Sequence, residues 1–302
     1  MSIPVGRESW GGSGRWKTAT LLLIVVVAAQ LLFTAGLLTE LSSLRSKYNR
    51  QYLELKNLQN QHEALLNQYA TLNQTLNKLL ENYQKLRRKI NLHSGTEDIT
   101  PLITPGDPAV GQLVLSLTGG WQRPGDTGEL LDDVFVLYSW VVSNIEYRGD
   151  SLYPVLPSSP DGPLEFRDDV WQFANETLQL GAGDCEDMAI LLCSLILNYV
   201  GDAYPAECII IVGSDEAHVA VQLYLKNGKM VILDPAGRYY TCNALWQITA
   251  KDVETEIHEW LNYWAPFLGS GVRVSAVFSD KIYVEFSSTE NYVSWMLSRG
   301  AS

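Results

Sequence analysis

Glycine and proline are absent between Gly36 and Gly95, although the chain of 302 residues holds 23 glycines and 12 prolines. Both residue types interrupt helices, so their absence favours one long helix. Basic residues are scarce in the remaining part: residues 95–302 carry 10 Lys and Arg against 29 Asp and Glu, a net charge of −19. Because phosphate contacts need Lys and Arg, this acidic part argues against nucleic acid as a partner.

Cysteine is also rare, with four in the chain, and their spacing does not match that of a metal site. The sequence therefore predicts no metal and no cofactor. Cys193 lies in a run of Leu and Ile and is expected in the core. Cys208 and Cys242 are candidates for a disulfide if the domain lies outside the cell.

A membrane span is predicted near the N-terminus, after a tail of residues 1–17. Thr18 to Leu38 are 21 residues without a charge, and at about 1.5 Å per residue they reach roughly 31 Å, the core of a bilayer. Arg15 and Lys17 before the span favour a single-pass protein of the cell membrane with its N-terminus inside and its globular domain extracellular. A cleaved signal peptide is the alternative, but the apolar run is longer than the usual 7 to 15 residues.

A coiled-coil stalk is predicted for residues 40–92, where apolar residues recur at alternating steps of three and four. Leu44 to Ile90 would form a rod about 70 Å long. Gln51 and His62 interrupt the apolar seam, and a lone polar residue there more often fixes register than binds a metal. The stripe favours a homo-oligomer. The alternative is a helix that packs on its own globular domain.

A globular domain is expected at residues 110–302, after a proline-containing linker at 93–109. Helical and strand patterns occur in an order that predicts an α+β fold with an antiparallel sheet. Asn227-Gly228 favours a hairpin between two of the strands. The helices are expected at 130–145, 171–180, 184–200 and 253–264, and the strands at 207–212, 218–225, 230–234, 272–278 and 281–286.

Cys185 is a candidate nucleophile, because it falls in the first turn of the helix that follows Asp184. Free N–H groups at a helix start stabilise a thiolate, whereas the acids on both sides of the cysteine raise its pKa. His218 begins one predicted strand and Asp234 ends the next, so a base and its orienting carboxylate are available nearby. Together they form a candidate Cys-His-Asp triad.

The chain resembles the transglutaminase-like superfamily of papain-related cysteine enzymes from about Leu113 to Gly237. The resemblance is carried by Trp171-Gln172, Glu176-Thr177-Leu178, Gly181-Ala182-Gly183-Asp184-Cys185-Glu186-Asp187 with Ala189, His218-Val219-Ala220-Val221 and Leu233-Asp234-Pro235. It implies that Cys185 forms a thioester with an amide carbonyl, with His218 as base and Asp234 orienting it. Family members often follow the histidine with Ala-Trp, and this chain has Val219-Ala220 instead.

An oxyanion hole needs a second donor besides the Cys185 backbone N–H, and Trp171, Gln172 and Gln179 are the candidates. The favoured function is a membrane-anchored cysteine protease, amidase or transglutaminase-type acyltransferase that acts on a protein or peptide substrate. The main alternative is a catalytically silent binding or scaffold module, assembled through its coiled coil. In a third possibility, the coiled coil carries the function and the domain only caps it.

Overall fold

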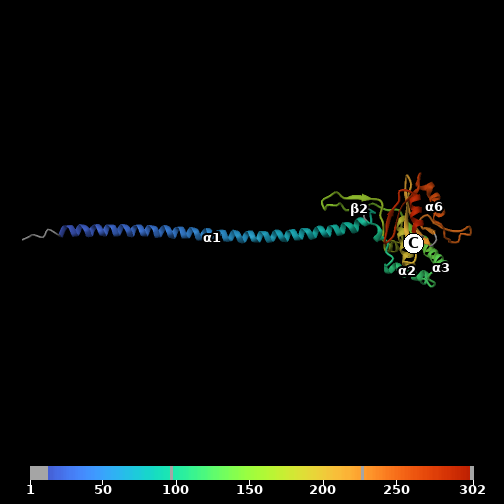
Figure 1. The fold of residues 1–302 in the computed structure, drawn as a ribbon, viewed down its shortest axis with the longest axis horizontal. Helices are drawn as coiled ribbons and strands as arrows, with labels where there is room; N and C mark the ends of the chain where they lie inside the picture. Colours follow the sequence, from blue (N-terminus) through green and yellow to red (C-terminus); the bar gives the residue numbers. More distant parts are fainter. Residues whose placement is uncertain (1–12, 96–97, 226–227, 300–302) are drawn as a thin grey trace, which may run out of the picture. The chain divides into compact units, whose positions relative to one another are not determined.

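A computed structural model describes residues 13–95, 98–225 and 228–299. The chain divides into two compact units, Met1–Leu80 and Glu81–Ser302. Helix α1, Ser13–Leu92, forms the described part of the first unit and continues into the second (Figure 1). By length and composition, its N-terminal part is apolar enough to cross a membrane. Residues 1–12 of the predicted tail lie outside the described residues, and residues 13–17 already belong to α1.

The predicted heptad positions within the first unit are exposed, with Leu65 63 % and Leu72 67 % accessible. The last turns of α1 belong to the second unit and make polar contacts there. The hydroxyl of Tyr83 donates to the Pro157 carbonyl over 2.8 Å, and Asn91 exchanges hydrogen bonds of 2.9 and 2.8 Å with the Leu156 backbone. For these turns, packing on the globular domain is the observed arrangement.

The segment expected to be a linker packs into the globular unit. Ile99, Leu102 and Ile103 are buried in its core, around a short 3-10 helix at Thr100–Leu102. Helix α2, Pro108–Thr118, follows directly and is capped by Asp107, which accepts a hydrogen bond from the Ala109 N–H. The prolines suggested a linker, but these three apolar side chains are more stable when buried.

The globular unit is α+β with an antiparallel sheet, as expected from the order of elements. Strands at all five predicted positions join this sheet, whose order is β11-β10-β5-β6-β7-β8 with β9 beside β7. Strands β6 and β7 pair antiparallel as the hairpin prediction requires, although Asn227 lies outside the described residues. The bounds are β5 Ala206–Val212, β6 Ala217–Leu225, β7 Lys229–Asp234, β8 Tyr239–Tyr240, β9 Lys251–Asp252, β10 Arg273–Phe278 and β11 Tyr283–Glu285.

Helices cover both faces of the sheet and form two apolar cores (Figure 1). Alternate residues of a strand face opposite sides, so Val219 and Val221 pack with the first core and Ala220 with the second. The first core contains α2, α3 Thr127–Asn144, α4 Ala174–Leu180 and α5 Cys185–Val200; the second contains α6 Val253–Leu268 and α7 Thr289–Ser298. Helices α2 and α7 were not predicted.

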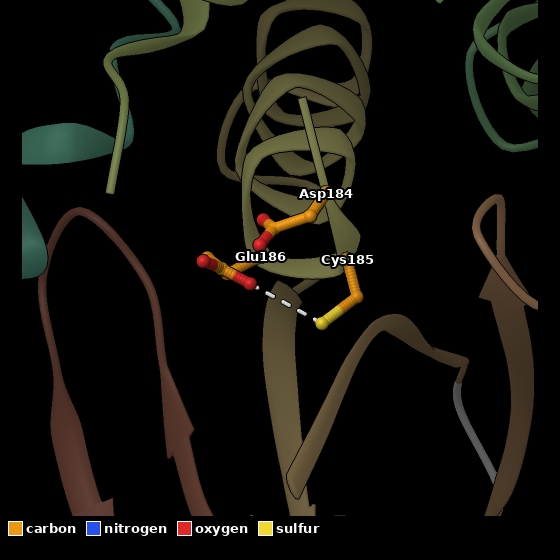
Figure 2. A group of neighbouring side chains, drawn as sticks. All are labelled: Asp184, Cys185 and Glu186. Carbon is orange, nitrogen blue, oxygen red and sulfur yellow. Dashed lines mark hydrogen bonds between the residues drawn. The ribbon is translucent and has the colours of Figure 1, made fainter. Parts of the chain in front are cut away.

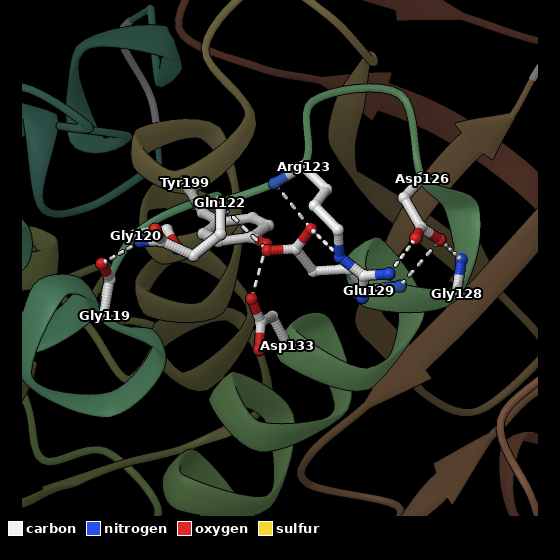
Figure 3. Close-up of polar contacts among 9 residues, drawn as sticks. All are labelled: Gly119, Gly120, Gln122, Arg123, Asp126, Gly128, Glu129, Asp133 and Tyr199. Atoms are coloured by element: carbon white, nitrogen blue, oxygen red, sulfur yellow. Dashed lines mark hydrogen bonds and ion pairs between the residues drawn. The ribbon is translucent and has the colours of Figure 1, made fainter.

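Polar contacts fix the start of α3 and join that helix to α5, which begins at Cys185 (Figure 3). Glu129 near the start of α3 accepts the backbone N–H groups of Gln122 and Arg123, each over 2.7 Å. One turn later on α3, Asp133 accepts a hydrogen bond from the Tyr199 hydroxyl of α5. The Tyr199–Asp133 bond, together with the shared apolar core, holds α5, the helix on which the candidate nucleophile lies, against α3.

Candidate active site

Cys185 is the first residue of α5, as predicted, and its side chain is half-buried. Asp184 occupies the N-cap position but makes no capping hydrogen bond through its side chain. The chain reaches the helix through β4, Ala182–Gly183, which pairs parallel with β1, Glu146–Tyr147. Glycine is needed in β4, because a Cβ on Gly183 would lie 2.5 Å from that of Asp187.

The thiol of Cys185 donates a hydrogen bond to Oε2 of Glu186 over 3.2 Å (Figure 2). Burial raises the pKa of this thiol well above its ordinary value, and the negative charges of Glu186 and Asp184 raise it further. The Val219 backbone N–H acts in the opposite direction. The helix start therefore does not lower the thiol pKa here, because desolvation and the adjacent acids outweigh it.

His218 and Asp234 lie together, as predicted, and both are buried. Their separation is 2.9 Å between His218 Nε2 and Asp234 Oδ2. In the ladder Val221 pairs with Leu233, so one step further Ala220 lies opposite Asp234 and His218 is its diagonal neighbour on the same face. A diagonal pair brings imidazole and carboxylate together without any shift of register.

The carboxylate of Asp234 accepts three more hydrogen bonds, all from N–H groups. Trp260 and Trp264 of α6 donate their indole N–H groups to Oδ2 over 3.0 and 2.8 Å. The Gly237 backbone N–H donates to Oδ1 over 2.7 Å. Four N–H groups thus surround a carboxylate that is fully buried, and such donors offset the cost of burying its charge.

The structure unites two members of the candidate triad by a hydrogen bond and leaves the third separate. Both Cys185 and His218 are described, and no hydrogen bond joins the thiol to the imidazole. The thiol is directed to Glu186 instead. Since Nε2 of His218 contacts Asp234, Nδ1 is the ring nitrogen left to receive a proton.

An acidic cluster lies beside the thiol and contains Asp150, Asp169, Asp184, Glu186 and Asp187. Burial is the main cause of raised pKa values here, reaching about 6 for Asp150, about 10 for Glu186 and about 8 for Asp187. Two buried oxygens of the cluster, Oδ1 of Asp184 and Oε1 of Glu186, lack a hydrogen-bond partner.

Three combinations of these side chains have ligand atoms within 4.8 Å of one another: Asp150, Asp184 and Asp187; Asp150, Asp169 and Glu186; Asp184, Cys185 and Glu186. Carboxylate oxygens are ligands that Ca²⁺ and Mg²⁺ prefer. The first two combinations are therefore the residues that could hold such a cation, which cysteine spacing alone did not indicate.

The three candidate oxyanion donors have different surroundings. Gln172 gives both its backbone N–H and its amide to Asp187, with the backbone bond at 2.7 Å. Trp171 packs against Phe278 at a ring distance of 5.7 Å, and its indole nitrogen is buried. Gln179 is exposed, so it is the candidate whose amide is accessible to a ligand.

A cavity of about 540 Å³ lies next to the start of α5. Gln179 and Gly183 line it. Asp150 of the acidic cluster also lines it, as does Gln172, which hydrogen-bonds to Asp187 of that cluster. Its remaining lining residues are His93, Arg148, Gly149, Ser151, Tyr153, Val170, Glu176, Leu180 and Ala182. This space adjoins the segment that leads into Cys185, which makes it a candidate region for part of a substrate.

All four cysteines are free, so the candidate disulfide between Cys208 and Cys242 is not formed. Cys208 of β5 is fully buried, close to the equally buried Cys193, whereas Cys242 is half-buried. Cys193 lies in the core as predicted. Cys185 and Cys242 are therefore the thiols that a reagent can reach.

Comparison with known proteins identifies a family model for part of the chain. The CEP76 peptidase-like domain matches residues 169–265, which include Cys185, His218 and Asp234. The predicted peptidase-like fold of the papain and transglutaminase kind is confirmed. A human relative, "Protein CC2D2B", is 26 % identical over 56 % of this chain, and the match spans only 11 % of that relative's length.

Solved structures with some likeness include a putative cysteine protease from Cytophaga hutchinsonii and LapG from Legionella pneumophila. The first has 19 % identity and a TM-score of 0.30, over 46 % of this chain and 42 % of the other. Calcium-bound LapG has 16 % identity and a TM-score of 0.30, over 63 % of this chain and 98 % of its own. Such values transfer no residue roles to this chain.

Sequence reasoning missed several residues near the site. Trp260 and Trp264 are four residues apart in a helix that was predicted, so a shared aromatic face was visible, but not what it contacts. Asp150 and Asp169 had no signal, because they join the acidic cluster only through folding. Tyr147 was also missed; it pairs with Gly183, two residues before Cys185, and burial raises its pKa to about 12.

Proposed function

We propose that this chain is a membrane-anchored thiol enzyme that cleaves or transfers amide bonds of proteins or peptides. Cys185 is the nucleophile, His218 the general base and Asp234 the group that orients the imidazole. The observation that carries the proposal is the buried contact of 2.9 Å between His218 Nε2 and Asp234 Oδ2. The family match over residues 169–265 supports it.

The reaction begins with rotation of the Cys185 side chain from Glu186 toward His218, since catalytic hydrogen bonds often form only with substrate bound. Nδ1 of His218 takes the thiol proton, and sulfur bonds to the amide carbonyl carbon. The carbon–nitrogen bond then breaks, and the leaving amine takes the proton from His218. Water or a second amine, deprotonated by His218, then attacks the thioester carbonyl; the carbon–sulfur bond breaks, the acyl group leaves on the new oxygen or nitrogen, and His218 returns the proton to the Cys185 sulfur.

The transition state places negative charge on the carbonyl oxygen, which needs N–H donors. The Cys185 backbone N–H is the first donor of the proposal. The accessible amide of Gln179 is the second, since Gln172 already bonds to Asp187 and Trp171 is packed inside.

The N-terminal part of α1 presents this domain at the cell membrane in the proposal, with the N-terminus inside and the domain extracellular. Exposed apolar residues at heptad spacing in residues 40–80 support a coiled coil between copies of the chain. The net charge of −19 in residues 95–302 supports a protein or peptide substrate and not a nucleic acid.

Selective alkylation tests the nucleophile. In a Cys242→Ser background, Cys185 is the accessible thiol, because Cys193 and Cys208 are fully buried. Iodoacetamide should label this protein once and inhibit hydrolysis of a fluorogenic peptide library, and Cys185→Ala should abolish both. Added primary amines that appear in the product indicate transfer, and their absence indicates hydrolysis. Labelling that persists in Cys185→Ala contradicts the proposal.

A silent binding module is the second candidate, and one observation favours it: the thiol hydrogen-bonds to Glu186 and not to the imidazole. In that case His218→Ala leaves the alkylation rate of Cys185 unchanged. An active enzyme requires that rate to fall when the imidazole is removed.

A further inference from the structure

One face of helix α6 contacts the turn that carries Asp234. Trp260, Tyr263 and Trp264 lie three and four residues apart, so their side chains project on the same side of the helix. Trp260 and Trp264 donate to Asp234, and the Tyr263 hydroxyl donates to the Gly237 carbonyl over 2.7 Å. These three residues form what we call the α6 clamp.

The α6 clamp directs its indole groups to the oxygen that also faces the histidine. Oδ2 of Asp234 receives His218 Nε2 at 2.9 Å, Trp260 Nε1 at 3.0 Å and Trp264 Nε1 at 2.8 Å. A carboxylate has two soft torsions, and donors from a rigid helix restrict both. The position of this oxygen, and with it the N–H tautomer of the imidazole, is therefore set by α6.

Trp264 also contacts the imidazole directly. The centroids of the His218 and Trp264 rings are 3.7 Å apart, with 31° between their planes. Stacking of this kind holds the ring in place, and an aromatic face attracts the imidazolium that forms when the ring accepts a proton. Trp260 is more distant from the imidazole, at 6.2 Å between ring centroids.

The turn after Asp234 leaves space for Trp264 only because residue 237 is glycine. A Cβ on Gly237 would lie 2.6 Å from Cζ2 of Trp264 and 2.7 Å from Oδ2 of Asp234. Any larger side chain must separate the indole from the carboxylate. Gly237 in the turn and Trp264 in α6 are thus both required for the contact between the indole and Asp234.

We propose that Trp264, supported by Trp260, is a positioning residue for the candidate triad: its indole holds Asp234 in place and its ring face holds His218. This inference rests on the proposed function. Trp264 acts through Asp234 and His218, and its effect is on the orientation and charge of the imidazole.

The test measures the rate of Cys185 alkylation by iodoacetamide from pH 5 to 9, in the Cys242→Ser background. Trp264→Phe retains an aromatic ring and loses the N–H donor. We expect a rate roughly ten-fold lower near neutral pH, the size typical for loss of one hydrogen bond to a charged group, with the profile displaced along the pH axis. Trp295→Phe is the matched control, because Trp295 contacts Phe286 and Tyr292.

A purely structural role would lower stability without moving the pH profile. Replacement of Trp264 by benzothienylalanine keeps the shape and stacking of the indole and removes only its N–H, so it distinguishes the hydrogen bond from the fold. Gly237→Ala should change the profile in the same direction. The proposal is overturned if Trp264→Phe and the benzothienylalanine protein both give the wild-type profile.

If the proposed function is wrong, Cys185 of the His218→Ala variant is alkylated at the wild-type rate at every pH. The positioning role is then read from the ring itself: nitrogen-15 NMR should show His218 with its proton on Nε2, and Trp264→Phe should increase the other tautomer. An unchanged tautomer in that spectrum overturns the positioning role as well.

Discussion

Two buried carboxyl groups near the site have opposite surroundings. Asp234 at the end of β7 is fully buried and receives four N–H donors. Glu186 in α5 is 5 % exposed, and one of its oxygens has no partner. Its neighbours include Asp184 and Asp187, and burial with these charges raises its pKa to about 10. The same chemical group is thus surrounded by donors on one side of the site and by acids on the other.

The difference shows what determines the role of a buried acid. Donors held by α6 and the following turn satisfy the oxygens of Asp234 and fix the carboxylate, which can then orient an imidazole. Desolvation and like charges favour a protonated acid, which can hold a neutral thiol by a hydrogen bond. The candidate site therefore joins an activating half, His218 and Asp234, to a half in which Cys185 is kept as a thiol.

The largest expected effect comes from Asp234→Asn, which disrupts the activating half. An amide presents an NH₂ group to donors that need an acceptor, and it favours the wrong imidazole tautomer. We expect turnover of an amide substrate to fall by about 10³ to 10⁴-fold. Steady-state kinetics measures the effect, with circular dichroism as the control for folding. Activity within ten-fold of wild type would show that Asp234 does not orient His218.

Gly183→Ala tests how closely the start of α5 is packed beside the acidic cluster. The new Cβ would lie 2.5 Å from Cβ of Asp187 and 2.7 Å from its Oδ2, so the helix start must shift. We expect a loss of about 1–3 kcal/mol in the free energy of unfolding, measured in urea. Gly106→Ala is the matched control, since nothing lies within 4 Å of its Cβ position. Equal stability of both variants would contradict this packing.

Glu186→Gln replaces a buried acid of the acidic cluster by a neutral amide. A pKa of about 10 in the folded chain, above the ordinary 4.5, means that this group's contribution to stability is fully present below about pH 4.5 and is lost as pH rises toward 10. The variant should therefore lose less stability than wild type between pH 5 and 9. Thermal unfolding in buffer with EDTA measures this slope without a divalent cation.

The same substitution should also make the thiol more reactive. Above the Glu186 pKa of about 10 the carboxylate charge raises the pKa of Cys185, so at about pH 10.5 alkylation of Glu186→Gln should be faster than that of the wild-type protein. Glu216→Gln serves as a control on an exposed acid. Identical alkylation rates in Glu186→Gln and wild type would mean that Glu186 does not restrain the thiol.

The smallest effect on the candidate site is expected from substitutions at the predicted heptad core positions of the first unit. Leu65→Glu with Leu72→Glu should convert an oligomer to a monomer in detergent, since charge at heptad core positions opposes association. Asn67→Glu with Gln74→Glu changes the outer face of the same turns and is the matched control. Light scattering gives the mass, and alkylation of Cys185 should stay unchanged. A wild-type monomer would exclude the coiled coil.

The sequence was sufficient where the physical cause is local. Gly181-Ala182-Gly183 followed by an apolar repeat predicts a helix that begins at Cys185, and alternating β-branched residues predict the strands of His218 and Asp234. The linker prediction differed because prolines near Pro101 are a local signal, whereas burial of Ile103 depends on distant residues. The surroundings of each acid were not predictable either, because Trp264 and Asp234 are 30 residues apart.

The sequence by itself determined the long helix over the glycine-free stretch between Gly36 and Gly95, the α+β order of the domain and the chemical groups of the candidate triad, since all three follow from local pattern and residue type. Only the tertiary structure decided which acid is surrounded by donors. It directed the Cys185 thiol to Glu186, placed His218 diagonal to Asp234 and brought Trp264 onto both of them. Such contacts depend on the pairing of β6 with β7 and on the packing of α6, which a one-dimensional pattern does not specify.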